Sequence, residues 1–302
     1  MTAFNAARST VWAWPRGHRP SLRDATDPVS WEGFQLDCTV DDRDPHQFSD
    51  VWERVLTGTQ PELRAGRRLL KHLPADVRCK LCGAPLEGPI SPLMRLVGKG
   101  RWPKNPTFCR SCFTYLVDNR GGAEIQCSLM FADVRGSTTI AEELRPVDVH
   151  ALMNRFFMTA AKVLVDHDAI VDRFVGDQAI GIFVPALTGD QHAARAIEAA
   201  QALLAATGHS DRTPWVPVGA GVHTGLAFVG SVGSEAHVDF TALGDTVNIA
   251  ARLSSAAAVG ETLVTLEAAA SANLEAARFD RRELALKGRN APTSVLVVSS
   301  PR

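Results

Sequence analysis

The stretch from Gly219 to Leu253, GAGVHTGLAFVGSVGSEAHVDFTALGDTVNIAARL, constrains the fold more than any other part of the chain. It begins with alternating apolar residues, which predict a strand. An apolar run interrupted by glycines comes next, and a polar turn follows that run. A helical pattern starts only at Asp245 and Thr246. Asn248 and Arg252 are four residues apart on that helix and therefore share one face. An amide and a guanidinium beside a glycine-rich turn are typical of a site that binds an anion.

Bulk properties of the chain exclude several classes of protein. The 302 residues are enough for one large domain or two smaller ones. The formal net charge of −1 argues against a dedicated nucleic-acid binder, which carries a strong basic excess. No apolar run approaches the roughly 20 residues that span a bilayer, and the N-terminal residues lack an apolar segment followed by a cleavage site. We therefore expect a cytoplasmic protein without a membrane or nucleic-acid partner.

Four of the six cysteines form two CxxC pairs, Cys79 with Cys82 and Cys109 with Cys112. Two such pairs place four thiolates around a tetrahedral Zn²⁺, and ion binding then supplies folding free energy that a short segment lacks. The loop between the pairs is longer than usual for this pattern. A redox role is disfavoured because no βαβ pattern surrounds either pair, and four cysteines leave no open position for catalysis. The pattern predicts one structural zinc ion in a zinc-ribbon-like module over residues 76–120.

The segments around this module leave two questions open. Residues 1–75 are predicted to be irregular or helical, with two short helices on either side of a break at Gly58–Pro61. These helices either cover the module or contribute to a dimer. The loop between the cysteine pairs is typical either of a surface for nucleic acid or an acidic partner, or of a solvated loop around a metal. Its charge density favours the solvated loop; the residues concerned are Arg95, Lys99, Arg101, Trp102, Lys104, Phe108 and Arg110.

Residues 121–302 are predicted to form one α+β domain. Strand patterns are expected near 125–134, 169–176, 178–184, 217–225 and 261–265, with two more within 284–298. Helical patterns are expected over 136–165 with a break at Pro146, over 190–207, from 245 onward, and over 267–273. The order β-α-β-β-α-β with later additions indicates a ferredoxin-like sheet with helices packed on one face. The chain has neither a GxxxxGK[ST] loop nor a GxGxxG turn after a strand, which argues against P-loop and Rossmann folds.

Two aspartates stand in similar settings at the ends of predicted strands, Asp133 in FADVRGST and Asp177 in RFVGDQ. If the two strands are neighbours, both carboxylates converge on one spot, where oxygen ligands suit Mg²⁺ or Mn²⁺. The turn at Ser137 and Thr138 begins a helix, so its backbone N–H groups are candidates for binding phosphate. Composition alone favours the simpler interpretation, in which these are ordinary turn and capping residues.

Three motifs in order decide between these interpretations. FADVRGSTTIAE, VDRFVGDQAIGIF and GVHTG with the following VGSVGSEAHVDFTALGDTVNIAARL strongly resemble the catalytic domain of class III nucleotide cyclases, over roughly residues 124–298. The resemblance implies an enzyme that converts a nucleoside triphosphate to its 3′,5′-cyclic monophosphate and pyrophosphate for intracellular signalling. The upstream module with its cysteine pairs resembles an accessory module of some bacterial members more loosely.

The resemblance also implies roles for individual residues. Two Mg²⁺ or Mn²⁺ ions are expected on Asp133, Asp177 and the carbonyl of Val134. Asn248 and Arg252 match the pair that orients the ribose and stabilises the pentavalent transition state, and a lysine that contacts the terminal phosphates matches Lys287. Catalytic domains of this family pair head to tail, and each site takes its metals from one subunit and the Asn/Arg pair from the other. The chain is therefore expected to form a homodimer with two composite sites.

The positions that read the base depart from the family pattern. Arg173 stands where adenylate-forming members usually have lysine, and Thr241 occupies the partner position. A cationic donor and a hydroxyl suit the acceptors of adenine, so ATP ranks first. Arginine presents a planar fork of donors where lysine presents a point charge, so UTP or CTP ranks second as the substrate. GTP ranks third because the Glu/Cys pattern of guanylate formation is absent. The alternative to an enzyme is a catalytically inactive relative of the cyclases that binds a nucleotide or a partner.

Overall fold

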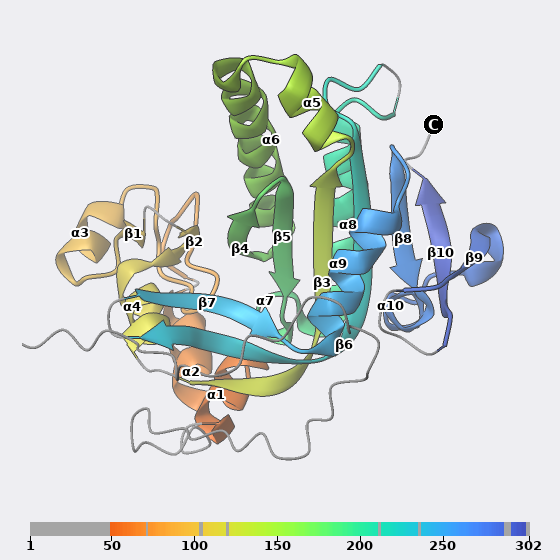
Figure 1. Cartoon of the computed structure of the whole chain (residues 1–302). Helices are drawn as coiled ribbons and strands as arrows, with labels where there is room; N and C mark the ends of the chain where they lie inside the picture. The colour runs from red at the N-terminus through yellow and green to blue at the C-terminus, as the bar shows by residue number, and fades with distance from the viewer. Residues whose placement is uncertain are drawn as a thin grey trace, which may run out of the picture. The chain divides into compact units, whose positions relative to one another are not determined.

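The structure is a computed structural model, and it describes residues 49–70, 72–102, 105–118, 121–210, 213–234, 237–286 and 291–299. The expectations for residues 1–48, for Lys104 and for Lys287 fall outside the described residues. The described part belongs to one compact unit, which Figure 1 shows in chain order from orange to blue. No helix within the described residues is both long and apolar enough to cross a membrane.

Two short helices lead into the module that holds the cysteine pairs. Helices α1 (Ser49–Leu56) and α2 (Pro61–Leu70) confirm the predicted break between them. Helix α1 buries Trp52 against the sheet, where its ring lies 5.9 Å from that of Phe240. We call residues 76–118 the cysteine module. Its elements are α3 (Ser91–Leu96), β1 (Arg101–Trp102), β2 (Asn105–Cys109) and α4 (Arg110–Asp118).

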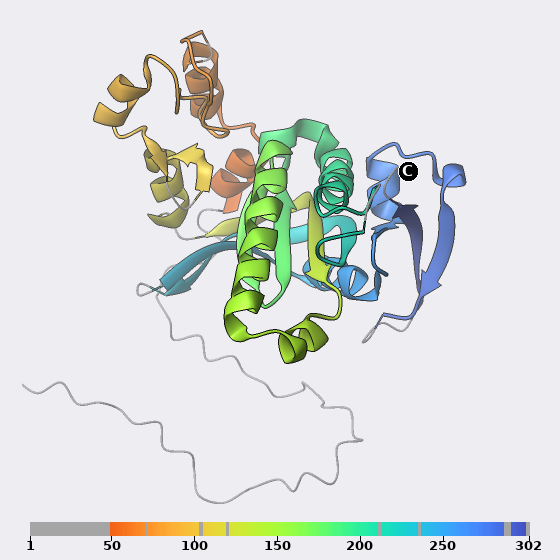
Figure 2. The ribbon, with the colours of Figure 1, turned by 90° about the horizontal axis from the view of Figure 1, so that it is seen from above.

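One eight-stranded sheet forms the rest of the unit, with strand order β4-β5-β3-β6-β8-β10-β9 and with β7 paired to β6. Its pairings are antiparallel except for β6 with β8. Figure 2 shows the cysteine module beyond one end of this sheet and β9 with β10 at the other end. The strands are β3 (Gly122–Val134), β4 (Ile170–Val175), β5 (Gln178–Phe183), β6 (Val218–Ser234), β7 (His237–Leu243), β8 (Glu261–Thr265), β9 (Asp280–Leu284) and β10 (Thr293–Ser299).

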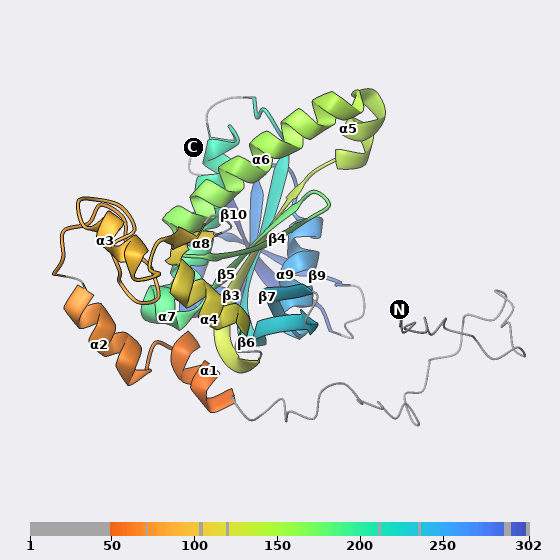
Figure 3. The same ribbon diagram turned by 90° about the vertical axis from the view of Figure 1, so that its left-hand side faces the viewer.

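Helices cover both faces of the sheet, so the prediction that they pack on one face is wrong. On β8, Val264 belongs to the core that α6 and α8 cover, whereas its neighbour Leu263 packs with Leu253 of α9. Figure 3 separates α8 on one side of the strands from α9 and β7 on the other. The helices are α5 (Ser137–Glu143), α6 (Pro146–Asp166), α7 (Pro185–Thr188), α8 (His192–Ala206), α9 (Asp245–Ala256) and α10 (Leu266–Ser271), with 3₁₀ turns at Gly189–Gln191 and Ala276–Arg278.

Strand β3 lies near the middle of the sheet and is apolar on both faces because both faces are covered. Leu129 and Phe131 point into the core shared with α1 and the cysteine module, and Met130 and Ala132 point into the core under α6 and α8. This strand carries Asp133 at its end. The two cores therefore hold the proposed metal-binding end of β3 from both sides.

Close packing of α9 on the sheet depends on one glycine in β6. A Cβ added at Gly221 would lie 2.5 Å from both Leu253 Cβ and Ser254 N of α9, which is shorter than real Cβ contacts. Because α9 carries Asn248 and Arg252, this contact sets how far that pair stands from the strands.

We predict that Gly221→Ala lowers the free energy of unfolding by about 2 kcal/mol or more, because the added methyl group forces α9 off the sheet. Gly66→Ala is the matched control: it lies in α2 with nothing within 4 Å of the added Cβ, so it should be neutral or stabilise by up to about 1 kcal/mol. Urea unfolding followed by circular dichroism measures both. Equal stability of the two variants would contradict the packing described here.

Candidate active site and cysteine cluster

The structure brings the two predicted metal-binding aspartates together. Strands β3 and β5 are antiparallel neighbours, with Asp133 in register opposite Gln178. The amide of Val134 donates a hydrogen bond to the backbone oxygen of Asp177 at 3.3 Å. Asp177 lies in the tight turn before β5, where Gly176 adopts φ 61°. Strand pairing and this turn place both carboxyl groups at one end of the sheet.

Electrostatics at this position favour a cation. Asp133 is buried, and burial is the main cause that raises the pKa of its carboxyl to about 6. The charge of Arg135 opposes this shift, and the charge and hydrogen bond of Asp177 add to it. Two carboxyl groups that repel each other beside a backbone carbonyl are a donor set that fits Mg²⁺ or Mn²⁺, since hard cations take oxygen ligands.

Arg135 is a residue that sequence reasoning did not single out. Its guanidinium forms an ion pair with Asp133 and donates from Nη1 to the backbone oxygen of Ser255 at 2.7 Å. Its Nε is buried without a hydrogen-bond partner in the described part of the chain. Arg135 thus supplies positive charge to the aspartates and links the end of β3 to the last turn of α9. The sequence signal was its position two residues after Asp133.

The predicted phosphate-binding turn follows directly on β3. Gly136 adopts φ 69° and precedes α5, whose first residues are Ser137 and Thr138. A left-handed conformation is easily adopted only by glycine, which allows the chain to turn sharply from the strand into the helix. Ser137 is half-buried and Thr138 is exposed, so the turn stands open close to Asp133.

Helix α9 presents the predicted Asn/Arg pair on its outer side. The helix buries Thr246, Ile249, Ala250, Leu253 and Ser254 toward the sheet. Asn248 is exposed and Arg252 is half-buried. Within the described part of a single chain, neither side chain makes a hydrogen bond or ion pair with Asp133 or Asp177. The structure therefore keeps this pair together on one face, without a direct bond to the aspartates among the described residues.

Of the remaining predicted residues, the structure describes Thr241 in full. Thr241 of β7 is buried, at 2% exposure, and its hydroxyl donates to Asp172 Oδ2 at 2.7 Å. Arg173 follows Asp172 in β4, but its side chain is outside what the structure describes, as is the whole of Lys287. Asp172 is a second residue that sequence reasoning missed, because a carboxylate beside Arg173 carries no motif of its own.

A cavity of about 500 Å³ lies next to α9. His223 and Asp245 line it together with the start of α10 and residues 291–294, which lead into β10. His223 Nδ1 is 2.8 Å from Thr265 Oγ1. Among the described side chains, none of those predicted for metal, base or transition-state binding lines this cavity.

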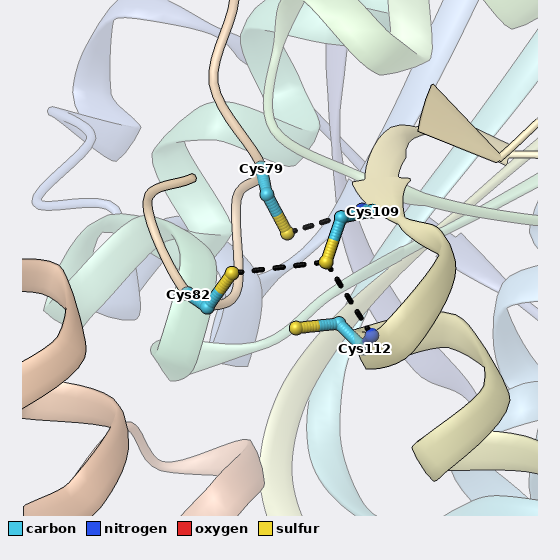
Figure 4. Close-up of side chains that lie close together, drawn as sticks. All are labelled: Cys79, Cys82, Cys109 and Cys112. Atoms are coloured by element: carbon cyan, nitrogen blue, oxygen red, sulfur yellow. Dashed lines mark hydrogen bonds between the residues drawn. The ribbon is translucent and has the colours of Figure 1, made fainter. Parts of the chain in front are cut away.

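The four cysteines of the CxxC pairs form one buried cluster, with all four sulfur atoms within 4.8 Å of one another (Figure 4). A regular tetrahedron with Zn–S bonds of about 2.3 Å separates its sulfur atoms by about 3.8 Å. The Sγ atoms of Cys82 and Cys109 are 3.8 Å apart. The cluster therefore fits a tetrahedral metal ion.

Hydrogen bonds support thiolates in part of this cluster. The amide of Cys109 donates to Cys79 Sγ at 3.2 Å, and the Lys99 ammonium lies 3.9 Å from Cys82 Sγ. Hydrogen bonds from the thiols of Cys109, Cys112 and Cys82 hold the pKa of Cys79 far below its usual value. Hydrogen bonds with Cys109, Cys79 and Cys82 raise the pKa of Cys112 instead, so only part of the cluster favours the deprotonated form that binds metal.

The cysteine module is attached to the sheet by charged side chains. Arg67 of α2 donates to the backbone oxygens of Leu81 at 2.8 Å and of Ala186 at 3.0 Å. Lys80, within the first CxxC pair, forms an ion pair with Asp168 in the turn before β4. Lys80 thus connects the first cysteine pair to the segment before β4, and Arg67 connects it to α7, which follows β5. Asp177 lies in the turn between these two strands.

The fold and this arrangement of aspartates define a member of the nucleotide cyclase class. The family model for the adenylate and guanylate cyclase catalytic domain matches residues 123–299. The chain belongs to this family. Adenylate cyclase 1 of Rhizobium meliloti (strain 1021) is 34% identical over 134 residues, which cover 42% of this chain and 20% of that protein. The chain thus spans about a fifth of the length of that relative.

Solved structures agree with this assignment. The adenylyl cyclase CyaB from P. aeruginosa is 27% identical with a TM-score of 0.52, and the match covers 60% of this chain and 97% of that one. The guanylyl cyclase Cya2 matches at 24% identity and a TM-score of 0.51, over 60% of this chain and 95% of that one, which supports the fold alone. The predicted α+β cyclase fold is confirmed.

We predict that Arg67→Ala destabilises the protein by about 2–3 kcal/mol, because buried carbonyl oxygens lose a charged donor. Arg68→Ala is the control: Arg68 is the next residue of α2 and is exposed, so its loss should change stability by less than about 0.5 kcal/mol. Thermal and urea unfolding measure both variants. If Arg67→Ala were as stable as Arg68→Ala, the cysteine module would not be held by these contacts.

Proposed function

We propose that the protein is a nucleotide cyclase that converts ATP to 3′,5′-cyclic AMP and pyrophosphate. The observation that carries the proposal is the meeting of Asp133 and Asp177 at adjacent strand ends, in a chain that presents Asn248 and Arg252 on α9. In the reaction the ribose 3′-oxygen attacks the α-phosphorus, and the bond to the departing pyrophosphate breaks. UTP, CTP and GTP remain the alternative substrates.

The residues of the chain divide this work between binding and charge stabilisation. Asp133, Asp177 and the Val134 carbonyl would hold the divalent ions, which would lower the pKa of the 3′-hydroxyl and neutralise the charge of the leaving phosphates. The planar guanidinium of Arg252 meets the charge that develops on the α-phosphate oxygens. Asn248 orients the ribose, and the N–H groups of the turn at Ser137 and Thr138, together with Lys287, bind phosphates. Arg173 and Thr241 form the base-recognition region.

We infer that each site is composite and that the protein acts as a homodimer. In one chain the outward face of α9 makes no bond to the aspartates among the described residues. A twofold pairing brings the α9 face of one copy to the aspartates of the other, and a twofold axis necessarily generates two equivalent sites. The fold family supports such pairing.

We predict that incubation with Mn²⁺ yields a cyclic product, most rapidly from ATP, when each of ATP, GTP, CTP and UTP is offered and products are identified by mass. Arg252→Ala should lower turnover by about 10²–10³ with the fold intact, the scale seen when one preorganised donor is lost. If none of the four nucleotides gave a cyclic product, the proposed cyclase activity would be wrong.

The composite site has its own test. Asp133→Asn and Arg252→Ala should each abolish most activity, yet a refolded equimolar mixture should recover about a quarter of the wild-type rate, since half the dimers carry one intact site. Recovery no greater than the sum of the two variants would show that each site lies within one chain. Size-exclusion chromatography with light scattering reports the dimer independently.

We also propose that the cysteine cluster holds one structural Zn²⁺, which the sulfur separations and the N–H donors support. Cys109→Ser should remove zinc and lower the midpoint of thermal unfolding, because ion binding supplies folding free energy. Cys127→Ala is the control, since Cys127 is buried in β3 away from the cluster. Mass-spectrometric metal analysis should find one zinc per chain in the wild type and control; a zinc-free wild type would reject the proposal.

A further inference from the structure

The β4 strand is irregular where the base-recognition region lies. Its pairing with β5 shifts between Val171, which opposes Gly181, and Phe174, which opposes Ala179. Asp172 and Arg173 therefore stand opposite one residue, Ile180, as in a β-bulge. Bulges are common beside active sites, where they redirect side chains.

Packing on either side of the bulge shows its effect. Residues three apart on a regular strand face opposite sides of the sheet. Val171 nevertheless packs into the core under α6 and α8, and Phe174 stacks on Phe157 of α6 with ring centroids 4.4 Å apart. Both flanking residues thus face α6, whereas the carboxylate of Asp172 reaches β7 on the other side of the sheet.

The hydrogen bond from Thr241 to Asp172 determines which of these two side chains can accept a hydrogen bond from a ligand. A threonine hydroxyl has one hydrogen, and at 2.7 Å from Asp172 Oδ2 that hydrogen is donated to the carboxylate. Thr241 is 2% exposed, whereas Asp172 is half-buried and so keeps contact with the surface. An ionised carboxylate has about four acceptor positions, so it can accept more than one hydrogen bond.

We propose that Asp172 is a specificity-determining residue whose carboxylate accepts a hydrogen bond from the exocyclic amine of adenine. Thr241 is then a positioning residue that holds the carboxylate from β7. A charged acceptor binds an N–H donor more strongly than a hydroxyl does, and the hydrogen bond from Thr241 of β7 fixes the direction of the carboxylate. This inference rests on the proposed cyclase function and deepens it, because it assigns the contact that selects the base.

The test compares ATP with purine riboside triphosphate, which lacks only the exocyclic amine. The wild type should prefer ATP by about 10- to 100-fold in kcat/KM, the scale of a hydrogen bond to a charged group. Asp172→Asn should reduce this ratio about tenfold or more, chiefly by slowing ATP. Asp166→Asn is the control, an exposed aspartate at the end of α6, and should keep the wild-type ratio.

Variants of Thr241 test the positioning role separately. Thr241→Val keeps the shape of the side chain but removes the hydroxyl, so kcat/KM should fall more with ATP than with the amine-free analogue, and the ATP preference should fall. Thr241→Ser restores the donor and should restore the preference. These two variants also carry the test if Asp172→Asn does not fold, and equal ratios in the valine and serine variants would then overturn the proposal.

Failure of this inference is distinguishable from failure of the proposed function. Cyclic AMP formation with an unchanged ATP preference in Asp172→Asn would overturn the role of Asp172 and leave the cyclase function standing. If no nucleotide were cyclised, competition binding of ATP against the amine-free analogue would still report the preference. A preference in binding that disappears in Asp172→Asn would then support the contact without the reaction.

Discussion

The antiparallel pairing of β3 with β5 is the interaction on which the rest of the site depends. It places Asp133 beside the turn that carries Asp177, and the resulting burial and repulsion raise the pKa of the Asp133 carboxyl to about 6. Two such groups are stable together only beside positive charge. In a single chain Arg135 supplies that charge. The proposed divalent ions are the natural additional source, since their oxygen ligands are already in place.

The cysteine module and the sheet share one hydrophobic core. Cys79 and Phe108 of the module lie in the same buried cluster as Ile125 of β3, Val229 of β6 and Trp52 of α1. The proposed zinc ion would therefore stabilise more than its own loops, because side chains from both parts interlock. The ion pair of Lys80 with Asp168 extends this connection to β4, whose bulge carries the proposed base-reading carboxylate.

Most strands and helices were predictable, and the misses have identifiable physical causes. Strand β6 was expected to end near Gly225 but continues to Ser234. Glycines such as Gly230 interrupt the apolar alternation, whereas a Cβ there would lie 2.3 Å from the backbone oxygen of Gly121, so glycine is needed for close approach of strands. The penultimate strand lies at Asp280–Leu284, earlier than expected, because its exposed charged residues lack the apolar alternation that marks a strand.

The sequence by itself determined the family and the four cysteines of one cluster, and it predicted the aspartates and the Asn/Arg pair, because each depends on residue types at fixed local spacing. Only the tertiary structure decided that α9 covers the face opposite α6 and α8, and that Arg135 pairs with Asp133. It alone also decided that Thr241 donates to Asp172. That bond joins residues 69 positions apart, across a bulge that shifts strand register, and no local pattern encodes such a meeting.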